Sequence, residues 1–356
     1  MSAAALLPLA LTPGCPAGVG PEVLVRALAA VADDAVPLSM PLHFFASAGL
    51  LERAAGYARV SVQREGNDVV VGRRRLHCLR ADVDDPGLHV RPGLVTAEAL
   101  QCQRDGLVAA IASAARGEVS AIVTAPVRKA ALVVDGVSWP GQTELVHHTL
   151  RDDDGPPLMV FAGAPFLLGL HTVHVPLRTV SAGLTVDGVV RSIVRLAQAT
   201  QRLLQVPRPK IAVLGVNPHA SEGGMFGDDE ERVLAPALAA VRATSLPIDL
   251  VGPLPADGFF ADVARHRKAT GVVGAQGAHA VLAMHHDQGL APYKLLVDGD
   301  GVNITWGVRV PRTSPDHGTA DALAGTGKAD PSSTLAALAA AVVLARAAAD
   351  ARTRGM

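Results

Sequence analysis

Apolar segments of strand length alternate along the chain with longer segments whose apolar residues recur at helical spacing. The helical period is clearest in residues 186–204, where Val189, Ile193 and Ala197 fall on one side of a helix. The alternation predicts an α/β fold with a largely parallel core sheet. The predicted strands are residues 6–11, 121–127, 157–162, 166–175, 210–216, 280–284 and 293–297, the predicted helices are residues 21–32, 96–115, 186–204, 228–242 and 332–349, and residues 266–279 are predicted as a loop.

Composition places the chain among globular proteins with a large core. Of its 356 residues, 49% are hydrophobic and 18% are charged, which excludes a mostly disordered chain, and this length favours two domains. The net charge of -1 provides no field of one sign to attract nucleic acid or an anionic membrane. No continuous apolar run reaches the roughly 18 residues of a membrane span. We therefore expect no nucleic-acid partner and no membrane partner.

The cysteines and the amino-terminal segment indicate a reducing compartment. Cys15, Cys78 and Cys102 are an odd number without metal-ligand spacing, so they do not form a disulfide framework. Residues 1–14 are apolar, lack a basic start and run directly into a Pro-Gly turn. This pattern fits a buried first strand better than a signal peptide. We expect a cytoplasmic protein.

The common nucleotide-binding signatures are missing. The segment Gly18-Val-Gly20 is followed by proline and does not complete a dinucleotide fingerprint, and Gly327-Lys328 lacks the hydroxyl residue of a phosphate loop. Residues 12–21 still join the first strand to the first helix, where glycines permit close approach and helix N–H groups face an anion. A plain strand-to-helix turn explains this loop equally well.

Histidines lie at the ends of three predicted strands. His174, His219 and His286 each lie at or just after the end of an apolar run. In an open α/β sheet these positions line the ligand cleft, and three imidazoles with an open position suit a catalytic divalent metal, Zn²⁺ in particular. Strand spacing places His171 opposite His174 and His285 opposite His286, so at most one member of each pair faces the cleft, and spacing does not say which member. Spacing alone also allows three unrelated loop histidines.

Polar and cationic side chains gather in the last third of the sequence, at Lys294, Asn303 and Arg312. Cations beside an otherwise neutral cleft indicate an anionic substrate such as a phosphate ester. For any one of these residues alone, ordinary solvated charge is the simpler explanation.

Several strings of the sequence, taken together, resemble one known family. They include TPGCPAGVGPE, WPGQTEL, GVNPHASEGGMFG, MHHDQGL and RTSPDHGTA, in the family's order and over nearly the whole chain. They resemble the 4-hydroxythreonine-4-phosphate dehydrogenases of pyridoxal phosphate biosynthesis. The resemblance implies an isocitrate/isopropylmalate-dehydrogenase-like fold with two α/β domains, a cleft between them and a homodimer with a shared active site. The implied domains are residues 1–135 with 306–356, and residues 136–305, which carry the histidines and the dimer contacts.

The resemblance also implies a reaction. The enzyme would oxidise the secondary alcohol of 4-phosphohydroxy-L-threonine with NAD, or NADP in its place, and the product would lose CO₂ to give 3-amino-2-oxopropyl phosphate. One divalent metal, zinc, magnesium or cobalt, would be held by His174, His219 and His286, with His286 supplied by the second subunit. The implied substrate contacts are Gln142, Thr143, Lys294, Asn303 and Arg312, and the candidates for the catalytic base are Asp257, Asp287 and Lys294.

Two positions depart from the family pattern. Gln142 stands where the family carries a substrate-contacting histidine, and Cys15 stands where it carries an acid. Glutamine offers a donor and an acceptor but does not titrate near neutrality. The alternative substrates are therefore a threonate or erythronate 4-phosphate and an aromatic dihydrodiol carboxylate. Further alternatives are a phosphotransacylase and a non-catalytic protein that binds a phosphorylated ligand.

Overall fold

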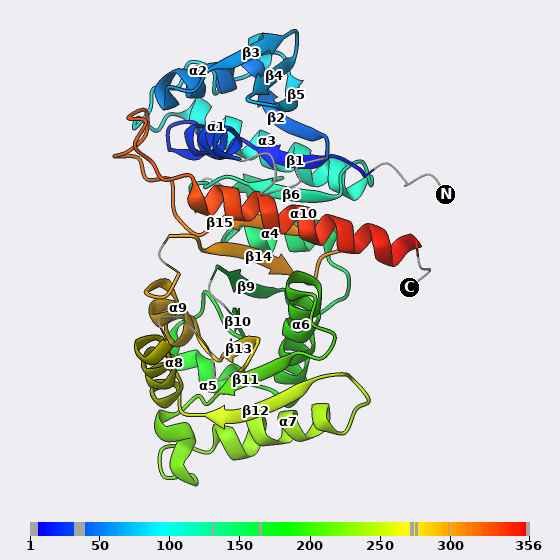
Figure 1. The fold of residues 1–356 in the computed structure, drawn as a ribbon, viewed down its shortest axis with the longest axis vertical. Helices are drawn as coiled ribbons and strands as arrows, with labels where there is room; N and C mark the ends of the chain where they lie inside the picture. The colour runs from blue at the N-terminus through cyan, green and yellow to red at the C-terminus, as the bar shows by residue number, and fades with distance from the viewer. Residues whose placement is uncertain are drawn as a thin grey trace. The chain divides into compact units, whose positions relative to one another are not determined.

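The chain folds into two compact α/β units, so the predicted fold class is confirmed. The structure, a computed structural model, describes residues 6–31, 40–129, 132–163, 166–270, 274, 277–297 and 299–353. The first unit comprises residues 1–154 and 308–356, and the second comprises residues 155–307 (Figure 1). The second domain expected from the sequence starts at residue 136 and so differs from the second unit by including the helix of residues 142–150.

The first unit is built on a mainly parallel sheet in the order β15-β6-β1-β2-β5-β4-β3. Strands β15, β6, β1, β2 and β5 are parallel, and β4 and β3 extend one edge as antiparallel strands. The bounds are β1 Leu9–Thr12, β2 Leu42–Ser47, β3 Val62–Glu65, β4 Asp68–Val71, β5 Arg74–Arg80, β6 Ala121–Thr124 and β15 Arg312–Pro315, with a separate hairpin of β7 Val133–Val134 and β8 Val137–Ser138. β1, β6 and β15 are buried along their whole length, as continuous apolar runs predict.

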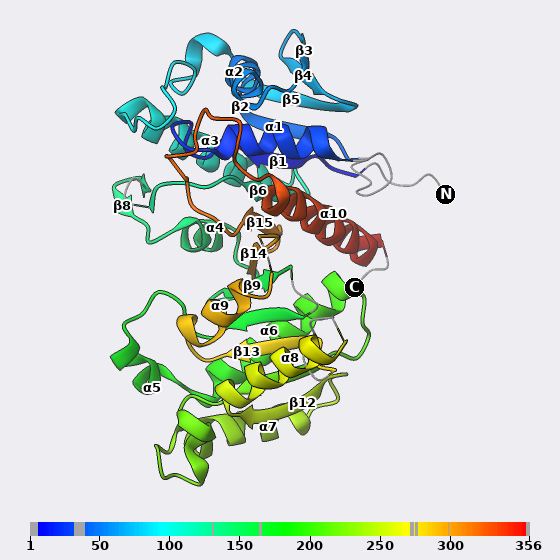
Figure 2. The same ribbon diagram turned by 60° about the vertical axis from the view of Figure 1, so that its left-hand side comes forward.

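Helices cover both faces of this sheet. α3 and α4 pack on one face, and α1, α2 and α10 lie on the other (Figure 2). Side-chain caps explain where two of them begin, because Ser47 accepts a hydrogen bond at the start of α2 and Thr96 does so at the start of α3. The bounds are α1 Gly20–Ala30, α2 Ala48–Ala58, α3 Ala97–Ala115, α4 Gln142–Leu150 and α10 Ser332–Thr353, with a 3₁₀ turn η1 at Asp82–Asp84.

Helix α10 is the only helix of the described residues that is long and apolar enough to cross a membrane. Its segment Ser332–Asp350 is 44% buried. The buried side packs on β15, β6 and α1, as in the core helix of a globular unit.

The second unit has a sheet in the order β12-β11-β13-β10-β9-β14. Strands β12, β11, β13 and β10 are parallel, and β9 runs antiparallel to both of its neighbours. Helices α6 and α7 lie on one face, and α8 and α9 lie on the other (Figure 1). The strand bounds are β9 Leu158–Ala162, β10 Leu167–Leu170, β11 Lys210–Leu214, β12 Asp249–Leu254, β13 Ala280–Ala283 and β14 Val302–Trp306. The helices are η3 Leu177–Thr179, α5 Val180–Gly183, α6 Val186–Leu204, η4 Pro218–Glu222, the π-helix η5 Glu230–Leu234, α7 Ala235–Arg242, α8 Ala256–Thr270 and α9 His286–Lys294.

Two sequence predictions about this unit are wrong. Residues 293–297 are not a strand, because α9 runs to Lys294 and a turn follows. Tyr293 and Val297 belong to the core, whereas Leu295 is exposed. The fully buried Tyr293 packs against Phe161 and Phe166, and a short apolar run does not distinguish a helix end from a strand. The predicted loop 266–279 is wrong at its start, since α8 continues to Thr270. Residues 271–273, 275 and 276 lie outside the described residues, and residues 277–279 are in neither a helix nor a strand, as predicted.

Candidate functional site

Three histidines follow neighbouring parallel strands of the second unit. His174 comes after β10, His219 after β11 and His286 after β13, and β13 pairs in parallel with both β10 and β11. The carboxyl ends of these strands therefore meet at one edge of the sheet, the edge at which α/β proteins bind ligands.

His174 and His286 form a close pair. Their ring centroids lie 6.1 Å apart with an angle of 39° between the rings. Two imidazoles on one tetrahedral ion would place their centroids roughly 5 Å apart, so the pair is close to a shared-ligand geometry. Nδ1 of His286 lies 2.7 Å from Oδ1 of Asp287. A carboxylate on one ring nitrogen orients the imidazole and leaves Nε2 for a metal, so this donor set fits a divalent cation.

His219 lies with a different set of residues. Its ring packs against Phe226 at 5.8 Å between centroids, and it lines a hollow together with Asp257, His285 and Gln288. Within the described part of the chain, no three His, Cys, Asp or Glu side chains gather closely enough to hold one metal ion. The structure thus brings His174 and His286 together in one protomer and places His219 on the same hollow as Asp257.

His171 and His285 have structural partners. Nδ1 of His171 lies 2.9 Å from the Ser192 hydroxyl, and burial lowers the pKa of His171 to about 4, so this imidazole is neutral. His285 caps α9 by accepting a hydrogen bond from the backbone N–H of Gln288, and burial also lowers its pKa.

His219 stands in a turn with an unusual backbone. His219, Ala220, Ser221 and Glu222 have consecutive φ values of 55°, 50°, 61° and 43°, a left-handed run that is costly for residues with a Cβ. The carboxylate of Glu230, only 4% exposed, accepts hydrogen bonds from the backbone N–H of Val216 at 2.7 Å and of Asn217 at 2.8 Å.

Hydrogen bonding keeps the Glu230 carboxylate charged. Burial alone would raise the pKa of Glu230, but donors on Asn217 and Ser221 outweigh that effect and hold the pKa below its usual range. The sequence analysis missed Glu230. The signal that was available is the acidic pair Asp229-Glu230 at the start of a predicted helix.

The remaining candidates of the second unit lie on α9 and β14. Asp287 and Lys294 are exposed, in the first and last turns of α9. Asn303 is half-buried on β14, and its Oδ1 is buried with no hydrogen-bond partner among the described residues. That oxygen is available to accept a hydrogen bond from a ligand.

The first unit holds the candidate anion contacts. Arg312 on β15 is 3% exposed, and its Nε and Nη2 both donate to the Thr124 hydroxyl, at 2.9 and 2.6 Å. Burial lowers the pKa of Arg312 to about 10, and the charge of Glu144 partly offsets this shift. Gln142 and Thr143 form the first turn of α4, whose N-cap Gly141 has no capping side chain. Backbone N–H groups at such a helix start are suited to an anion.

Gln142 presents an acceptor. Its Nε2 donates to the carbonyl of Ala125 at 3.3 Å, while its Oε1 is buried without a hydrogen-bond partner among the described residues. The family histidine that this residue replaces could be a cationic donor, so the departure at this position changes the hydrogen-bonding character offered to a ligand.

The glycine loop of residues 12–21 is explained by packing. A Cβ on Gly18 would lie 2.6 Å from the Thr319 carbonyl oxygen, and one on Gly20 would lie 2.9 Å from that of Pro13. Both glycines are therefore required by close packing against the protein itself, which favours a plain strand-to-helix turn over an anion-binding loop. Cys15 in the same loop is fully buried, and burial raises the pKa of its thiol.

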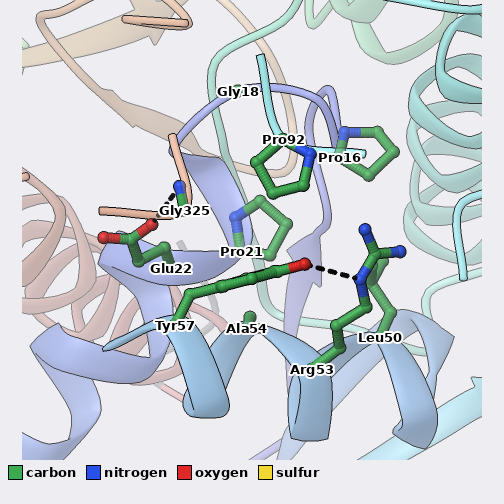
Figure 3. A pocket seen from close by; sticks show the side chains of 10 residues that line it. All are labelled: Pro16, Gly18, Pro21, Glu22, Leu50, Arg53, Ala54, Tyr57, Pro92 and Gly325. Carbon is green, nitrogen blue, oxygen red and sulfur yellow. Dashed lines mark hydrogen bonds between the residues drawn. The ribbon is translucent and has the colours of Figure 1, made fainter. Parts of the chain in front are cut away.

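A separate pocket in the first unit lies away from the predicted site residues. Three prolines and the ring of Tyr57 line it (Figure 3). Arg53 donates to the Tyr57 hydroxyl at 3.3 Å, and one oxygen of Glu22 accepts from the Gly325 N–H at 2.8 Å. The other oxygen of Glu22 points away from the Tyr57 ring (Figure 3). None of the predicted catalytic, metal or substrate residues lines this pocket.

Comparisons with known proteins identify the family of this chain. The profile of the family described as pyridoxal phosphate biosynthetic protein PdxA matches residues 38–341. A 4-hydroxythreonine-4-phosphate dehydrogenase of Burkholderia vietnamiensis is 40% identical over 96% of this chain and 98% of its own. The crystal structure of such a dehydrogenase from Klebsiella pneumoniae has a TM-score of 0.72 at 33% identity, covering 96% of this chain and 99% of that one. A terephthalate 1,2-cis-dihydrodiol dehydrogenase from Burkholderia xenovorans has a TM-score of 0.60 at 26% identity, covering 92% and 95%. The chain therefore belongs to the family of pyridoxal phosphate biosynthetic protein PdxA.

Proposed function

We propose that this chain oxidises the secondary alcohol of 4-phosphohydroxy-L-threonine with NAD, or NADP in its place, and that the product loses CO₂ to give 3-amino-2-oxopropyl phosphate. The reaction would serve pyridoxine 5'-phosphate biosynthesis in the cytoplasm. One observation carries the proposal: in a chain that belongs to a family of dehydrogenases, His174, His219 and His286 follow three neighbouring parallel strands.

The proposed metal ligands are these three histidines. The close pair of His174 and His286, with Asp287 on the far nitrogen of His286, supports a divalent cation, and imidazole ligands favour zinc or cobalt over magnesium. A bound divalent cation supplies Lewis-acid stabilisation to the alcohol oxygen as its proton leaves. Within one protomer His174 pairs with His286 and His219 lies apart, so the described residues of one chain do not gather all three ligands. We propose a homodimer that completes the site with His286 of the second subunit, and the mixed-dimer experiment below decides between this site and one that uses the His174–His286 pair of a single chain.

Arg312 and Thr143 are proposed to bind the substrate phosphate. The buried guanidinium offers charge-assisted hydrogen bonds to an anion, the uncapped start of α4 offers backbone N–H groups, and the charge of Glu144 in the first turn of α4 acts on Arg312. Lys294 would add a second cation. Asn303, through its unpartnered Oδ1, would accept a hydrogen bond from a substrate amine or hydroxyl.

The proton of the alcohol requires a base, and Asp257, Asp287 and Lys294 are the candidates. Asp287 is hydrogen-bonded to His286, which gives it an orienting role, whereas Asp257 lines the hollow that contains His219. NAD would accept the hydride. No residue is assigned to NAD, because the glycine loop that could approach a pyrophosphate packs against protein atoms.

Gln142 supports a second candidate substrate class. Its free Oε1 accepts a donor such as a hydroxyl and repels an anionic oxygen. Threonate or erythronate 4-phosphate, or an aromatic dihydrodiol carboxylate, would present hydroxyl groups there, and one structural relative is titled a cis-dihydrodiol dehydrogenase.

A panel of purified substrates tests the proposal. The protein is incubated with NAD and a divalent metal against 4-phosphohydroxy-L-threonine, the two sugar-acid phosphates and a dihydrodiol carboxylate. NADH formed fastest with 4-phosphohydroxy-L-threonine supports the first assignment, and preference for another member moves the assignment to that substrate. Acyl transfer to phosphate without NADH would indicate a phosphotransacylase, and binding without turnover would indicate a non-catalytic protein.

A further inference from the structure

The turn that carries His219 is held in a strained conformation by two buried acids. Four consecutive residues with positive φ form this turn, and none of them is glycine. Isolated residues of this kind occur in turns, but a run of four persists only when the surrounding structure over-determines it.

Glu230 supplies most of the hydrogen bonds. Its Oε1 accepts from the backbone N–H of Val216 and Asn217, and its Oε2 accepts from Nδ2 of Asn217 at 2.9 Å. The Ser221 hydroxyl, 1% exposed inside the turn, also donates to this carboxylate. A single side chain thus binds the entry to the turn and its interior.

Asp229 extends the network toward His174. It is 4% exposed and accepts from Asn217 Nδ2 at 3.2 Å and from Arg232 at 2.8 Å. It also accepts from the Ser181 hydroxyl at 2.7 Å, and Ser181 lies in α5, shortly after the segment that carries His174. The two acids therefore connect the His219 turn to the element that follows His174.

The backbone around Asp229 and Glu230 leaves room for these hydrogen bonds. Glu230 opens a π-helix, a rare form that is frequent at functional sites. A Cβ on Gly215 would lie 2.9 Å from Glu230 Oε1, and a Cβ on Gly227 would lie 2.7 Å from Asn217 Nδ2. Glycine at both positions lets the network close around the turn.

We propose that Glu230, with Asp229, is a positioning residue that fixes the strained turn and so sets the placement of His219 as a metal ligand. The inference rests on the proposed metal-binding function. Burying two adjacent carboxylates is costly, and hydrophobic residues would stabilise a merely structural turn as well or better. Their fully hydrogen-bonded arrangement instead specifies one conformation of the histidine.

Cobalt binding by the full-length protein tests the proposal without an activity assay. Co²⁺ is titrated into metal-free wild type, Glu230→Gln, Ser221→Ala, Ser181→Ala and Glu231→Gln, and both affinity and the visible absorption spectrum are recorded. Glu231 is the matched control, since it is adjacent and exposed. Circular dichroism, thermal unfolding and subunit mass show which variants are folded.

Glu230→Gln should bind Co²⁺ about 10- to 100-fold more weakly with an altered spectrum, as for other groups that orient metal ligands. Ser221→Ala and Ser181→Ala each remove one hydrogen bond and should weaken binding by about five-fold. Glu231→Gln should match wild type.

Wild-type affinity and spectrum in a folded Glu230→Gln would overturn the inference. If Glu230→Gln does not fold, unchanged Co²⁺ binding by Ser221→Ala overturns it. A wild type that binds no Co²⁺ would instead contradict the proposed function on which the inference rests.

Discussion

Replacing Arg312 by methionine should separate phosphate binding from stability. Burial lowers the pKa of this guanidinium to about 10, so keeping it charged in the free protein costs on the order of 3 kcal/mol. Methionine removes that cost and also removes the hydrogen bonds to Thr124, worth about 1–2 kcal/mol. We expect these effects to offset, so that the free energy of unfolding without ligand stays within about 2 kcal/mol of wild type.

Substrate binding should respond much more strongly. Loss of a charge-assisted contact to phosphate costs about 1.5–3 kcal/mol, so Arg312→Met should lower kcat/KM for the phosphorylated substrate by about 10- to 150-fold. A substrate analogue without the phosphate should lose far less. Inorganic phosphate should raise the Tm of wild type and not that of the variant.

A second buried arginine provides the control. Arg195 is 4% exposed and donates to the Pro156 carbonyl inside the second unit, where it packs against Gly307. Arg195→Met should reduce stability without a preference between phosphorylated and phosphate-free substrates. Equal losses on both substrates in Arg312→Met, or an unchanged Tm response to phosphate, would refute the phosphate assignment.

The remaining predictions concern histidines and Gln142. Gln142→His should raise turnover on 4-phosphohydroxy-L-threonine, and unchanged rates across the panel would show that this position is neutral. His171 binds its proton only near pH 4 in the fold but near 6.5 when unfolded, so stability should fall as pH drops from 6.5 toward 4, and denaturant unfolding of His171→Phe should show a flatter profile. Mixed dimers of His174→Ala and His286→Ala should recover up to roughly a quarter of wild-type activity, whereas no recovery despite subunit exchange would place both ligands on one chain. Chelation should abolish activity and Co²⁺ or Zn²⁺ should restore it, while activity that survives chelation would exclude an essential metal.

Secondary structure was predictable where the periodicity of apolar residues was strong. The helix predicted at residues 186–204 is present with the same bounds, because its apolar stripe and the cap at Thr185 act locally. The strand predicted at residues 293–297 is absent, because the local pattern there is ambiguous. Its four apolar residues fit a strand or a helix end equally well, and packing of Tyr293 against Phe161 and Phe166 decides the outcome.

The sequence was enough to predict the candidate site residues, but not the hydrogen bonds that hold them in place. Histidines after apolar runs mark the carboxyl edge of a parallel sheet, and the structure places all three after neighbouring strands. Nothing in the spacing indicates that Glu230 reaches back to Val216 and Asn217, since that contact depends on a strained turn and a π-helix. The spacing also does not indicate that Gln142 Nε2 donates to the Ala125 carbonyl, or that Gln142 Oε1 has no hydrogen-bond partner among the described residues.

The most direct test of the proposed function is to mix the purified protein with NAD, a divalent metal and 4-phosphohydroxy-L-threonine, and to follow NADH and CO₂ together. We predict that both appear in equal amounts and that 3-amino-2-oxopropyl phosphate is the product. NADH without CO₂, or no NADH from this substrate under conditions in which another member of the panel is oxidised, would contradict the assignment.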